Sequence, residues 1–442
     1  MSERLTDNTS PGHSRRNFIK ASSVAAVAGS LGITRGAYAA GSDEIKIALI
    51  GCGGRGTGAA MQALSTTAKV KVKLVAMADA FQERLDRSLN SLLKQPVADR
   101  IDVPKERQFV GLDAYQQAID CGVDMVLLCT PPGFRPLMFE AAVAAGKHVF
   151  MEKPVATDGP GVRRILETNK IAKEKGLLVA VGHHMRHEAS YGEMVERIHN
   201  GAIGDVQYLR AYFDSTGVWN RPRKPGQTEM EYQVNNWYYF TWLSGDHIVE
   251  QHVHDLDVCN WIMKGHPVEA QGTGGRQVRI GKEYGEIFDH HSIQFTYADG
   301  TKLFSECRHI PGCWNSFSQH AHGTKGVAHL IGHYMTELEL KGEKAQRWKR
   351  GPDGHQVEHD DLFAALVTGK SYNEADYGAS STMTAILGRM ASYSGKVVTW
   401  DKAINSKLNL APSKTSWEAQ PQSTPNEDGI YNCALPGISK AF

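Results

Sequence analysis

The sequence predicts a two-domain α/β protein, with a doubly wound parallel sheet followed by an α+β domain that has a largely antiparallel open sheet. Three observations support this prediction. The chain has 442 residues, more than one ordinary hydrophobic core accommodates. A glycine-rich turn near residue 51 joins a short apolar run to a helical pattern. Apolar runs and helical patterns then alternate, and this alternation stops after residue 187.

The N-terminal segment predicts an export signal that lies outside the fold. The stretch "SRRNFIK" at 14–20 precedes an apolar run at 21–31 and the small residues "AYA" at 37–39. A basic region, a short apolar stretch and a small-residue cleavage site form a secretory signal. The paired arginines indicate the twin-arginine type, which carries folded proteins. We expect a signal at 1–40, cleaved after Ala39, and a periplasmic or otherwise exported mature protein.

The composition excludes some partners. A net charge of +1, with 22% charged residues, gives no electrostatic reason to expect nucleic acid or an anionic membrane as a partner. The seven cysteines show no C-x-x-C spacing. A protein that folds before export should not depend on disulfides, so we interpret the cysteines as structural. Cys307 and Cys313 are candidates for a pair in an oxidising compartment.

The stretch "IKIALIGCGGRGTGAAMQAL" predicts a dinucleotide-binding turn of the Rossmann type. The apolar run at 45–50 suits a buried parallel strand, and it leads into a G-x-G-x-x-G sequence and a helical pattern. Gly51 permits the tight turn, Gly53 lets the backbone approach a pyrophosphate, and Gly56 lets helix and strand pack closely. The N-terminus of the helix favours the phosphates.

A carboxylate further along the chain indicates which nucleotide is bound. "KLVAMADA" is the second strand and ends at Asp79, roughly 20 residues after the last glycine, where a ribose-binding carboxylate belongs. A carboxylate at this position favours NAD over NADP, because it repels a 2′-phosphate. A helix-capping role for Asp79 is the alternative.

Further strand–helix repeats complete the first domain, which we place at 41–184. "DMVLLCTPP" is a strand that breaks at Pro131, and "KHVFMEKP" and "LLVAVGHH" are strands that follow helical patterns. In a doubly wound sheet, ligands bind at the carboxyl ends of the strands. The predicted cofactor-binding residues are therefore Gly51, Gly53, Gly54, Arg55, Gly56, Asp79, Thr130, Pro131, Glu152 and Lys153.

These motifs resemble those of the Gfo/Idh/MocA family, the glucose–fructose oxidoreductase and inositol dehydrogenase group. The resemblance covers roughly residues 45–400 and rests on the glycine turn, "EKP" at 152–154, "VGHHMR" ending at Arg186, and the H-x-x-D of His254 and Asp257. It implies an NAD(P)-dependent oxidoreductase that acts on CH–OH groups of a sugar or polyol. It also implies a homo-oligomer that associates through the open sheet of the second domain.

The resemblance also implies the catalytic residues. In that family the EKP lysine lies beside the nicotinamide and the substrate, and an acid four residues before a histidine completes the site. Carried over to this sequence, these residues are Lys153, Glu250 and His254. The chain departs from the family pattern at two positions, because the family more often has Asp in place of Glu250 and many members have His in place of Arg135.

The stretch "SGDHIVEQHVHDLD" suggests how these groups are arranged. We expect one helix over 246–263, on which Glu250 and His254 are i,i+4 neighbours. His247 lies two turns from His254, too far for both to bind one zinc ion, so we predict no metal. We interpret His254 as a proton acceptor oriented by Glu250, with Lys153 at the alcohol oxygen. Which of Lys153 and His254 is the immediate base stays open, and a buried polar role without chemistry is the alternative for His254.

Residues 185–400 form the second domain, and residues 401–442 form an extended arm rich in Pro, Ser and Asn. We expect the arm to wrap its own subunit or a neighbour. Alternating and apolar patterns predict strands at 205–214, 287–298, 301–310, 315–321 and near 327–331.

An irregular aromatic segment, residues 217–242, interrupts this sheet. A long irregular segment in a compact domain is usually functional, so we place it over the active site, with Trp219 and Asn236 among the candidate sugar contacts. Packing alone is the alternative for each of these residues. The predicted substrate-binding residues are Arg186, Trp237, Tyr238 and Asp257.

The sequence therefore predicts an exported NAD-dependent oxidoreductase that transfers hydride between a ring carbon of a sugar or polyol and tightly held NAD. Tight retention is expected because little free NAD is available outside the cytoplasm. Two alternatives stay open. One is an NAD-dependent glycosidase that works by oxidation, elimination, hydration and re-reduction; its N-acetylgalactosaminidase branch shares "GGRGTG" at 53–58 but tends to lack the lysine found here as Lys153. The other is a non-catalytic sugar-binding protein, against which Lys153, Glu250 and His254 together argue.

Overall fold

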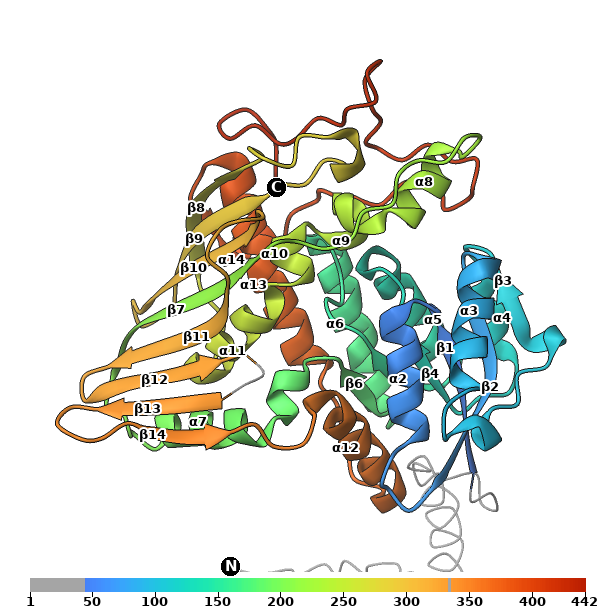
Figure 1. Ribbon diagram of the computed structural model, residues 1–442, viewed down its shortest axis with the longest axis horizontal. Coiled ribbons are helices and arrows are strands. Elements are labelled where there is room, and N and C mark those ends of the chain that lie inside the picture. The colour runs from blue at the N-terminus through green and yellow to red at the C-terminus, as the bar shows by residue number, and fades with distance from the viewer. Residues whose placement is uncertain (1–43, 333–334) are drawn as a thin grey trace, which may run out of the picture.

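Two sheets organise the chain. The computed structural model describes residues 44–332 and 335–442, so the predicted export signal at 1–40 lies outside the described residues. A six-stranded sheet and a nine-stranded sheet stand side by side, with the long helix α13 (Ala375–Ser394) between them (Figure 1). Among the described helices, none is both long enough and apolar enough to cross a membrane.

The first sheet is entirely parallel and has the order β3-β2-β1-β4-β5-β6. Its central strands are apolar throughout because helices cover both faces. This confirms the predicted Rossmann domain. The strands are β1 (Glu44–Ile50), β2 (Lys71–Asp79), β3 (Gln108–Val110), β4 (Met125–Leu128), β5 (His148–Met151) and β6 (Val179–Val181). The helices are α2 (Gly54–Leu64), α3 (Gln82–Leu92), α4 (Ala114–Asp120), α5 (Arg135–Ala144) and α6 (Gly159–Glu174).

The second sheet is largely antiparallel, as predicted, with β7 and β10 as its parallel pair. Its order is β14-β13-β12-β11-β7-β10-β9-β8-β15. The sequence patterns missed four of these strands: β8 is rich in glycine, β14 is polar, β15 is short, and β13 was not recognised. The strands are β7 (Val206–Ser215), β8 (Glu269–Gly275), β9 (His290–Thr296), β10 (Lys302–His309), β11 (Ser316–Gly323), β12 (Gly326–Ile331), β13 (Met335–Leu340), β14 (Gln346–Lys349) and β15 (Val398–Thr399).

Helices cover one face of this sheet. Helix α13 packs on β8 and β9, and the other face carries exposed aromatic side chains such as Phe304 and Trp314. The sheet is therefore open on one side, as expected for an antiparallel sheet; the predicted oligomer interface on this face stays a prediction. The remaining helices are α7 (Ala189–His199), α8 (Glu229–Asn235), α9 (Thr241–Ser244), α10 (His247–Glu250), α11 (Val253–Met263), α12 (Gly354–Thr368) and α14 (Trp400–Ile404).

The prediction of one continuous helix over 246–263 is wrong. Helix α10 ends at Glu250 and α11 begins at Val253. The buried ring of His252 lies in the break, 3.1 Å from the carboxylate of Asp255 and 2.6 Å from the hydroxyl of Ser305 on β10. These contacts fix the break, so Glu250 and His254 are not i,i+4 neighbours on one helix.

His187 ties the start of the second domain to two helices. It ends the short 3₁₀ segment η4 (His184–His187). Its Nδ1 is 2.7 Å from the carboxylate of Asp361 on α12, and its Nε2 is 3.1 Å from that of Glu374, which precedes α13. Burial alone would lower the pKa of His187, but the hydrogen bonds to Asp361 and Glu374 raise it to about 10.

This raised pKa predicts how stability depends on pH. The stabilisation from charged His187 is fully present below the unfolded-state pKa of about 6.5 and is lost as the pH rises through about 10. We expect the free energy of unfolding of His187→Gln to differ most from wild type below pH about 6.5, with a difference that shrinks toward pH about 10. Urea unfolding across this range measures the difference, and a gap that stays constant or widens with pH would contradict the prediction.

Candidate functional site

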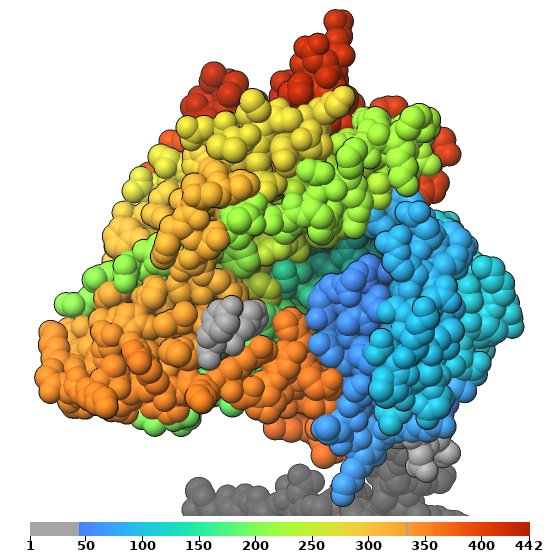
Figure 2. All heavy atoms as spheres, viewed as in Figure 1, coloured from blue at the N-terminus to red at the C-terminus, as the bar shows by residue number. Residues whose placement is uncertain are grey.

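A cavity of about 880 Å³ runs along the carboxyl ends of the first sheet. Figure 2 shows the hollow between the blue first domain and the green segment of the second domain. Ligands of doubly wound sheets bind at this edge. Among the predicted cofactor-binding residues, the cavity is lined by Gly51, Gly53, Gly54, Arg55, Gly56, Asp79, Thr130 and Pro131. Glu152 and Lys153 are not part of this lining.

The glycine turn leaves space for a dinucleotide. Gly51 has φ +100°, a conformation that favours glycine. A Cβ on Gly56 would lie 1.9 Å from the main-chain oxygen of Gly51, whereas Cβ atoms on Gly53 or Gly54 would meet nothing within 4 Å. Helix α2 begins here without a side-chain cap, so its first N–H groups are available to a pyrophosphate. The residues present therefore fit a dinucleotide.

Asp79 stabilises the turn and also faces the cavity. Its two carboxylate oxygens accept the N–H groups of Cys52 at 2.7 Å and Phe81 at 2.9 Å. Burial raises the pKa of Asp79, and these N–H groups offset part of the rise. Each oxygen keeps a second lone pair for a ribose hydroxyl. Helix α3 itself has no side-chain cap, so the structure does not show the capping role considered for Asp79, and the ribose role stays a prediction.

The aromatic segment at 217–242 covers this cavity. The guanidinium of Arg221 lies 3.7 Å over the ring of Trp219 and donates to the main-chain oxygen of Asn235 at 2.7 Å. Arg84, on α3 of the first domain, donates to the side-chain oxygen of Asn235 at 2.8 Å. The segment is therefore attached to the nucleotide-binding domain. Sequence reasoning missed both arginines, because nothing in their local sequence distinguishes them from surface arginines.

The structure gives the positions of three aromatic or amide residues proposed as sugar contacts. Trp237 lines the nucleotide cavity. Tyr238 is 2% exposed, and its hydroxyl has no hydrogen-bond partner in the described parts of the chain. Asn236 is fully buried and donates to the main-chain oxygen of Glu283 at 2.8 Å. Both side chains are buried, and the direct substrate contacts predicted for Tyr238 and Asn236 stay predictions.

Lys153 and Glu250, from different domains, meet between the two sheets. Lys153 follows β5, and its Nζ donates to the main-chain oxygen of Glu250 at 2.7 Å and lies 3.4 Å from the carboxylate Oε1. Burial raises the pKa of Glu250, and the charge of Lys153 opposes the rise. The two side chains are nearly buried, so each charge depends on the other for compensation.

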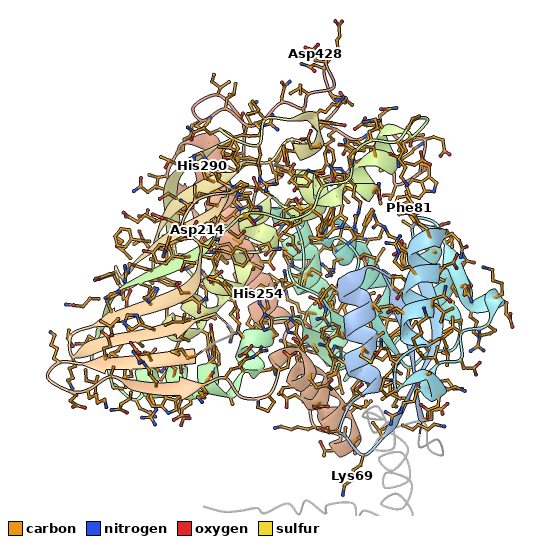
Figure 3. The ribbon with its side chains drawn as sticks, in the orientation of Figure 1. Lys69, Phe81, Asp214, His254, His290 and Asp428 are labelled. Carbon is orange, nitrogen blue, oxygen red and sulfur yellow. The ribbon has the colours of Figure 1, made fainter. Side chains whose placement is uncertain are left out.

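His254 lies at the start of α11, between the sheets (Figure 3). Its ring centroid is 4.8 Å from that of His184, and no described residue forms a hydrogen bond with its Nδ1. Burial lowers the pKa of His254 well below its usual value, and Lys153 is the largest of the charges that lower it further. The ring is therefore neutral near pH 7 and keeps a lone pair, although its lowered pKa makes it a weak base. The three predicted catalytic residues thus lie in one region.

Arg186 and Asp257 form a pair in this region. The guanidinium donates to both carboxylate oxygens at 2.8 and 2.9 Å, and Ser381 donates to the same carboxylate at 2.7 Å. Asp257 is 1% exposed and lies 3.7 Å from Nδ1 of His183. Its carboxylate is thus occupied and buried, which suits a role in positioning Arg186; the direct substrate contact predicted for Asp257 stays a prediction.

A second pair links the glycine turn to β5. Nε of Arg55 lies 2.9 Å from the carboxylate of Glu152. The buried Glu358 of α12 is close to both: burial and the charge of Glu152 raise the pKa of Glu358 well above its usual value, and Arg55 offsets part of this rise. Sequence reasoning missed Glu358, which is brought to the site only by the packing of α12 on α2.

The C-terminal arm lies over the covering segment, along α8 in Figure 1. The ring of Trp417 packs against Phe81, beside Asp79, with centroids 5.4 Å apart. Thr228 donates to the main-chain oxygen of Trp417 at 2.9 Å, and Tyr431 donates to the carboxylate of Glu229 at 2.5 Å. Of the two positions considered for the arm, the structure shows the one in which it wraps its own subunit.

Comparisons with known proteins agree with this geometry. Residues 45–183 match a family model described as "Oxidoreductase family, NAD-binding Rossmann fold". Residues 191–329 match the model of the GFO/IDH/MocA C-terminal domain. The first match covers nearly all of the first sheet, and the second covers β7 to β11 and most of β12 in the second sheet.

Two relatives illustrate the range of the family. The chain is 25% identical over 299 residues to inositol 2-dehydrogenase of Rhizobium meliloti (strain 1021), a match that covers 67% of this chain and 78% of the relative. It is 26% identical over 207 residues to 2,7-anhydro-N-acetylneuraminate hydratase of Mediterraneibacter gnavus, covering 46% of this chain and about half (49%) of the relative.

Two solved structures share the fold. Levoglucosan dehydrogenase in complex with NADH and levoglucosan superposes with a TM-score of 0.64 at 15% identity, covering 80% of this chain and 99% of the other. Aldose-aldose oxidoreductase from Caulobacter crescentus, complexed with glycerol, gives a TM-score of 0.64 at 18% identity with the same coverage. At these identities the similarity concerns the fold alone.

The glycine turn yields a prediction with an internal control. Gly56→Ala places a methyl group against the main-chain oxygen of Gly51, so we expect the free energy of unfolding to fall by roughly 1–3 kcal/mol. Gly54→Ala meets open space at the first position of α2 and should leave stability unchanged or slightly higher. Thermal unfolding of both variants checks this, and equal melting temperatures for the two would contradict it.

Proposed function

The chain belongs to the GFO/IDH/MocA oxidoreductase family, and from that premise we propose that it is an exported enzyme that transfers hydride between a ring carbon of a sugar or polyol and tightly held NAD. The family binds NAD in its Rossmann domain, and its members include dehydrogenases of sugars and polyols. The observation that carries the proposal is the meeting of Lys153, Glu250 and His254 beside the strand ends that line the nucleotide cavity.

The glycine turn and the start of α2 would hold the pyrophosphate, and Asp79 would hold the adenosine ribose. When bound, NAD supplies the acceptor or donor of hydride. The carboxylate of Asp79 favours the free ribose hydroxyls of NAD over the 2′-phosphate of NADP.

The residues between the sheets manage the proton. An ammonium group has three N–H donors; Lys153 directs its donors at Glu250 and keeps capacity for a substrate oxygen. A charge held in this way stabilises the alkoxide-like oxygen that develops when an alcohol is oxidised. His254, whose Nδ1 has no hydrogen-bond partner among the described residues, would accept the hydroxyl proton, as a weak base because burial and Lys153 lower its pKa.

Two features support tight retention of the nucleotide. The second domain supplies Trp219, Arg221 and Trp237 to the cavity wall, so a bound nucleotide is enclosed by both domains. The C-terminal arm then holds this cover through Trp417 and Tyr431. The export proposal rests on the sequence at 1–40 alone, and a cofactor that does not leave would suit an enzyme outside the cytoplasm.

A second candidate is a redox-neutral reaction at the same site, as in the glycosidase alternative. The relative named 2,7-anhydro-N-acetylneuraminate hydratase supports this redox-neutral candidate, because a hydratase produces no net oxidation. Product analysis distinguishes the two candidates. A keto sugar formed together with NADH supports the dehydrogenase, and release of an aglycone without net change in NADH supports the glycosidase.

Replacing Lys153 tests the proposed site. Lys153→Met keeps the length of the side chain but loses its charge and donors, so we expect hydride transfer to slow by about 10²–10⁴-fold. Nucleotide retention should stay at the wild-type level, because Lys153 does not line the nucleotide cavity. Single-turnover formation of NADH with a panel of sugars and polyols measures both quantities.

The control for this test is Lys370→Met, which alters an exposed lysine beyond the end of α12. The control should behave as wild type. Wild-type turnover in Lys153→Met would refute the assigned role. A wild-type protein that binds sugar but shows no turnover or product with any of them would support the non-catalytic alternative.

The arm yields a prediction about cofactor release. Trp417→Ala removes the contact with Phe81, and we expect NAD to dissociate about fivefold faster, since such an aromatic pair contributes on the order of 1 kcal/mol. Trp314→Ala, on the open face of the second sheet, is the matched control and should not change the rate. Displacement of bound NADH, followed by fluorescence, measures the rates; identical rates for both variants would contradict the role of the arm.

A further inference from the structure

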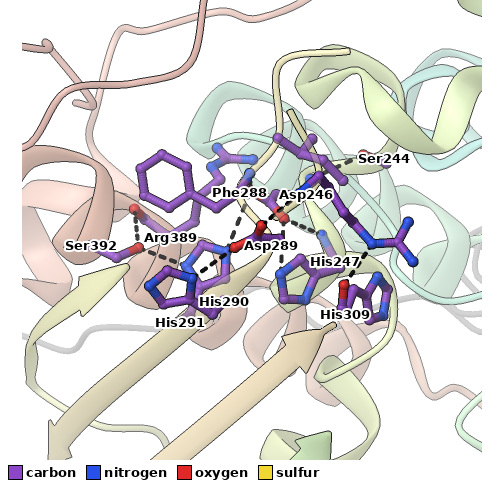
Figure 4. Close-up of polar contacts among 12 residues, drawn as sticks. Ser244, Asp246, His247, Phe288, Asp289, His290, His291, His309, Arg389 and Ser392 are labelled. Atoms are coloured by element: carbon purple, nitrogen blue, oxygen red, sulfur yellow. Dashed lines mark hydrogen bonds and ion pairs between the residues drawn. The ribbon is translucent and has the colours of Figure 1, made fainter. Parts of the chain in front are cut away.

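A cluster of buried polar side chains lies one turn before Glu250 (Figure 4). Asp246, His247 and His291 each place a ligand atom within 4.8 Å of the others. The ring of His309 stacks on that of His247, with centroids 4.4 Å apart. None of these four side chains is more than 2% exposed. We call Asp246, His247 and His291 the Asp246 cluster. Asp246 precedes α10, His247 is the first residue of α10, and His291 lies on β9.

His247 has unmet hydrogen-bonding capacity. Neither ring nitrogen has a hydrogen-bond partner among residues 44–332 and 335–442, and Nε2 lies 3.7 Å from the carboxylate of Asp246. Burial lowers the pKa of this ring well below its usual value, with His309 and His291 adding to the effect, so the ring carries one N–H group and one lone pair. Buried polar groups normally have partners, so the two ring nitrogens of His247 are available to a ligand.

His291 presents a lone pair to the same carboxylate. Its Nδ1 is 2.9 Å from the hydroxyl of Ser392, which also lies 3.2 and 3.1 Å from two main-chain oxygens of α13. When the proton of Ser392 goes to one of these main-chain oxygens, Ser392 accepts from Nδ1–H of His291. In that tautomer Nε2 of His291 is unprotonated and lies 3.3 Å from Oδ2 of Asp246. The two acceptors then face each other, an arrangement that a bound cation would stabilise.

Asp246 is held in an unusual conformation that aims its carboxylate at these rings. Its backbone has φ 75° and ψ 162°, a region that is essentially restricted to glycine. The carboxylate is fixed by the N–H of Phe288 at 3.0 Å and the hydroxyl of Tyr393 at 2.6 Å. Backbone strain of this kind collects at functional sites.

The surroundings restrict which cation fits. Arg279 donates to the main-chain oxygen of His309 at 2.5 Å, and Arg389 donates to that of Gly245 at 2.9 Å, so positive charge is already close. Asp246 and the nearby carboxylate of Asp289, which accepts three main-chain N–H groups, counter it. Mg²⁺ and Ca²⁺ require a shell of oxygen ligands. Two imidazoles and one carboxylate instead suit a late first-row divalent ion such as Zn²⁺.

We propose that Asp246, His247 and His291 bind one Zn²⁺ or a similar late first-row divalent ion. Tetrahedral zinc holds its ligand atoms about 3.3 Å apart, so the cluster would contract by roughly 1–1.5 Å on binding. The ion would join the start of α10 to β9 and thereby position Glu250 against Lys153. This is a positioning site, and metal binding itself does not depend on the reaction proposed above.

Metal content of the purified full-length protein tests the proposal. After removal of metal with a chelator and titration with Zn²⁺, wild type should bind about one ion per chain tightly. His291→Ala should lose that ion. The control His329→Ala should keep it: His329 belongs to a second His/Glu grouping, with Glu337 and Glu339, whose carboxylates already pair with Arg347 and His329.

A gentler pair of variants avoids any loss of folding. Ser392→Ala removes the hydrogen bond that fixes the His291 ring and should weaken Zn²⁺ binding by about 10–100-fold. Ser394→Ala, on the same helix and also buried, has no contact with an imidazole and should leave the affinity unchanged. The melting temperature of wild type should also rise with free Zn²⁺ concentration.

The proposal is overturned if wild type binds neither Zn²⁺ nor Co²⁺ stoichiometrically. It is also overturned if His329→Ala loses as much metal as His291→Ala, or if Ser392→Ala and Ser394→Ala have the same affinity. Because these measurements read metal content and affinity, they are independent of turnover. A failure of the hydride-transfer proposal would leave them unchanged.

Discussion

The hydrogen bond from Lys153 to the main-chain oxygen of Glu250 is the constraint on which the rest of the site depends. Lys153 follows a parallel strand of the first domain, and Glu250 ends a short helix of the second. A nearly buried ammonium needs acceptors, and a buried carboxylate needs a counter-charge. If the two domains shifted apart, both groups would lose compensation at once. The relative position of the domains and the geometry of the proposed catalytic groups are therefore set by the same contact.

Much of the fold could be predicted, because its signals are local. The buried strands of the first domain are apolar runs, and the glycine turn depends on close contacts within a few residues, such as Gly56 against Gly51. The failures have non-local causes. The break between α10 and α11 depends on Ser305, which is far from His252 in sequence. Strand β8 contains three glycines and low intrinsic strand propensity, yet it forms because β9 pairs along its whole length.

The sequence was sufficient to predict the residue types of the candidate site. It was not sufficient to predict which of these side chains are exposed to a ligand. The resemblance supplied Lys153, Glu250 and His254, and the strand ends supplied the lining of the nucleotide cavity. The aromatic segment suggested sugar stacking, but residue type alone does not distinguish a ring that faces a ligand from one that packs. Trp219 is stacked by Arg221, and Asp257 is occupied by Arg186. Arg221 is only two residues from Trp219, but Arg186 is 71 residues from Asp257, so only the tertiary structure assigns that second pair.

Burial has different consequences for two groups of histidines. Low polarity and the charge of Lys153 keep the ring of His254 neutral, which leaves a lone pair free but also makes the ring a weak base. The same low polarity surrounds His247 and His291, where both ring nitrogens of His247 and Nε2 of His291 have no hydrogen-bond partner among the described residues. A neutral ring without a partner destabilises a fold, while a neutral ring that coordinates a metal stabilises it. Helix α10 begins at His247 and ends at Glu250. A group that binds the ring of His247 therefore also fixes the position of Glu250.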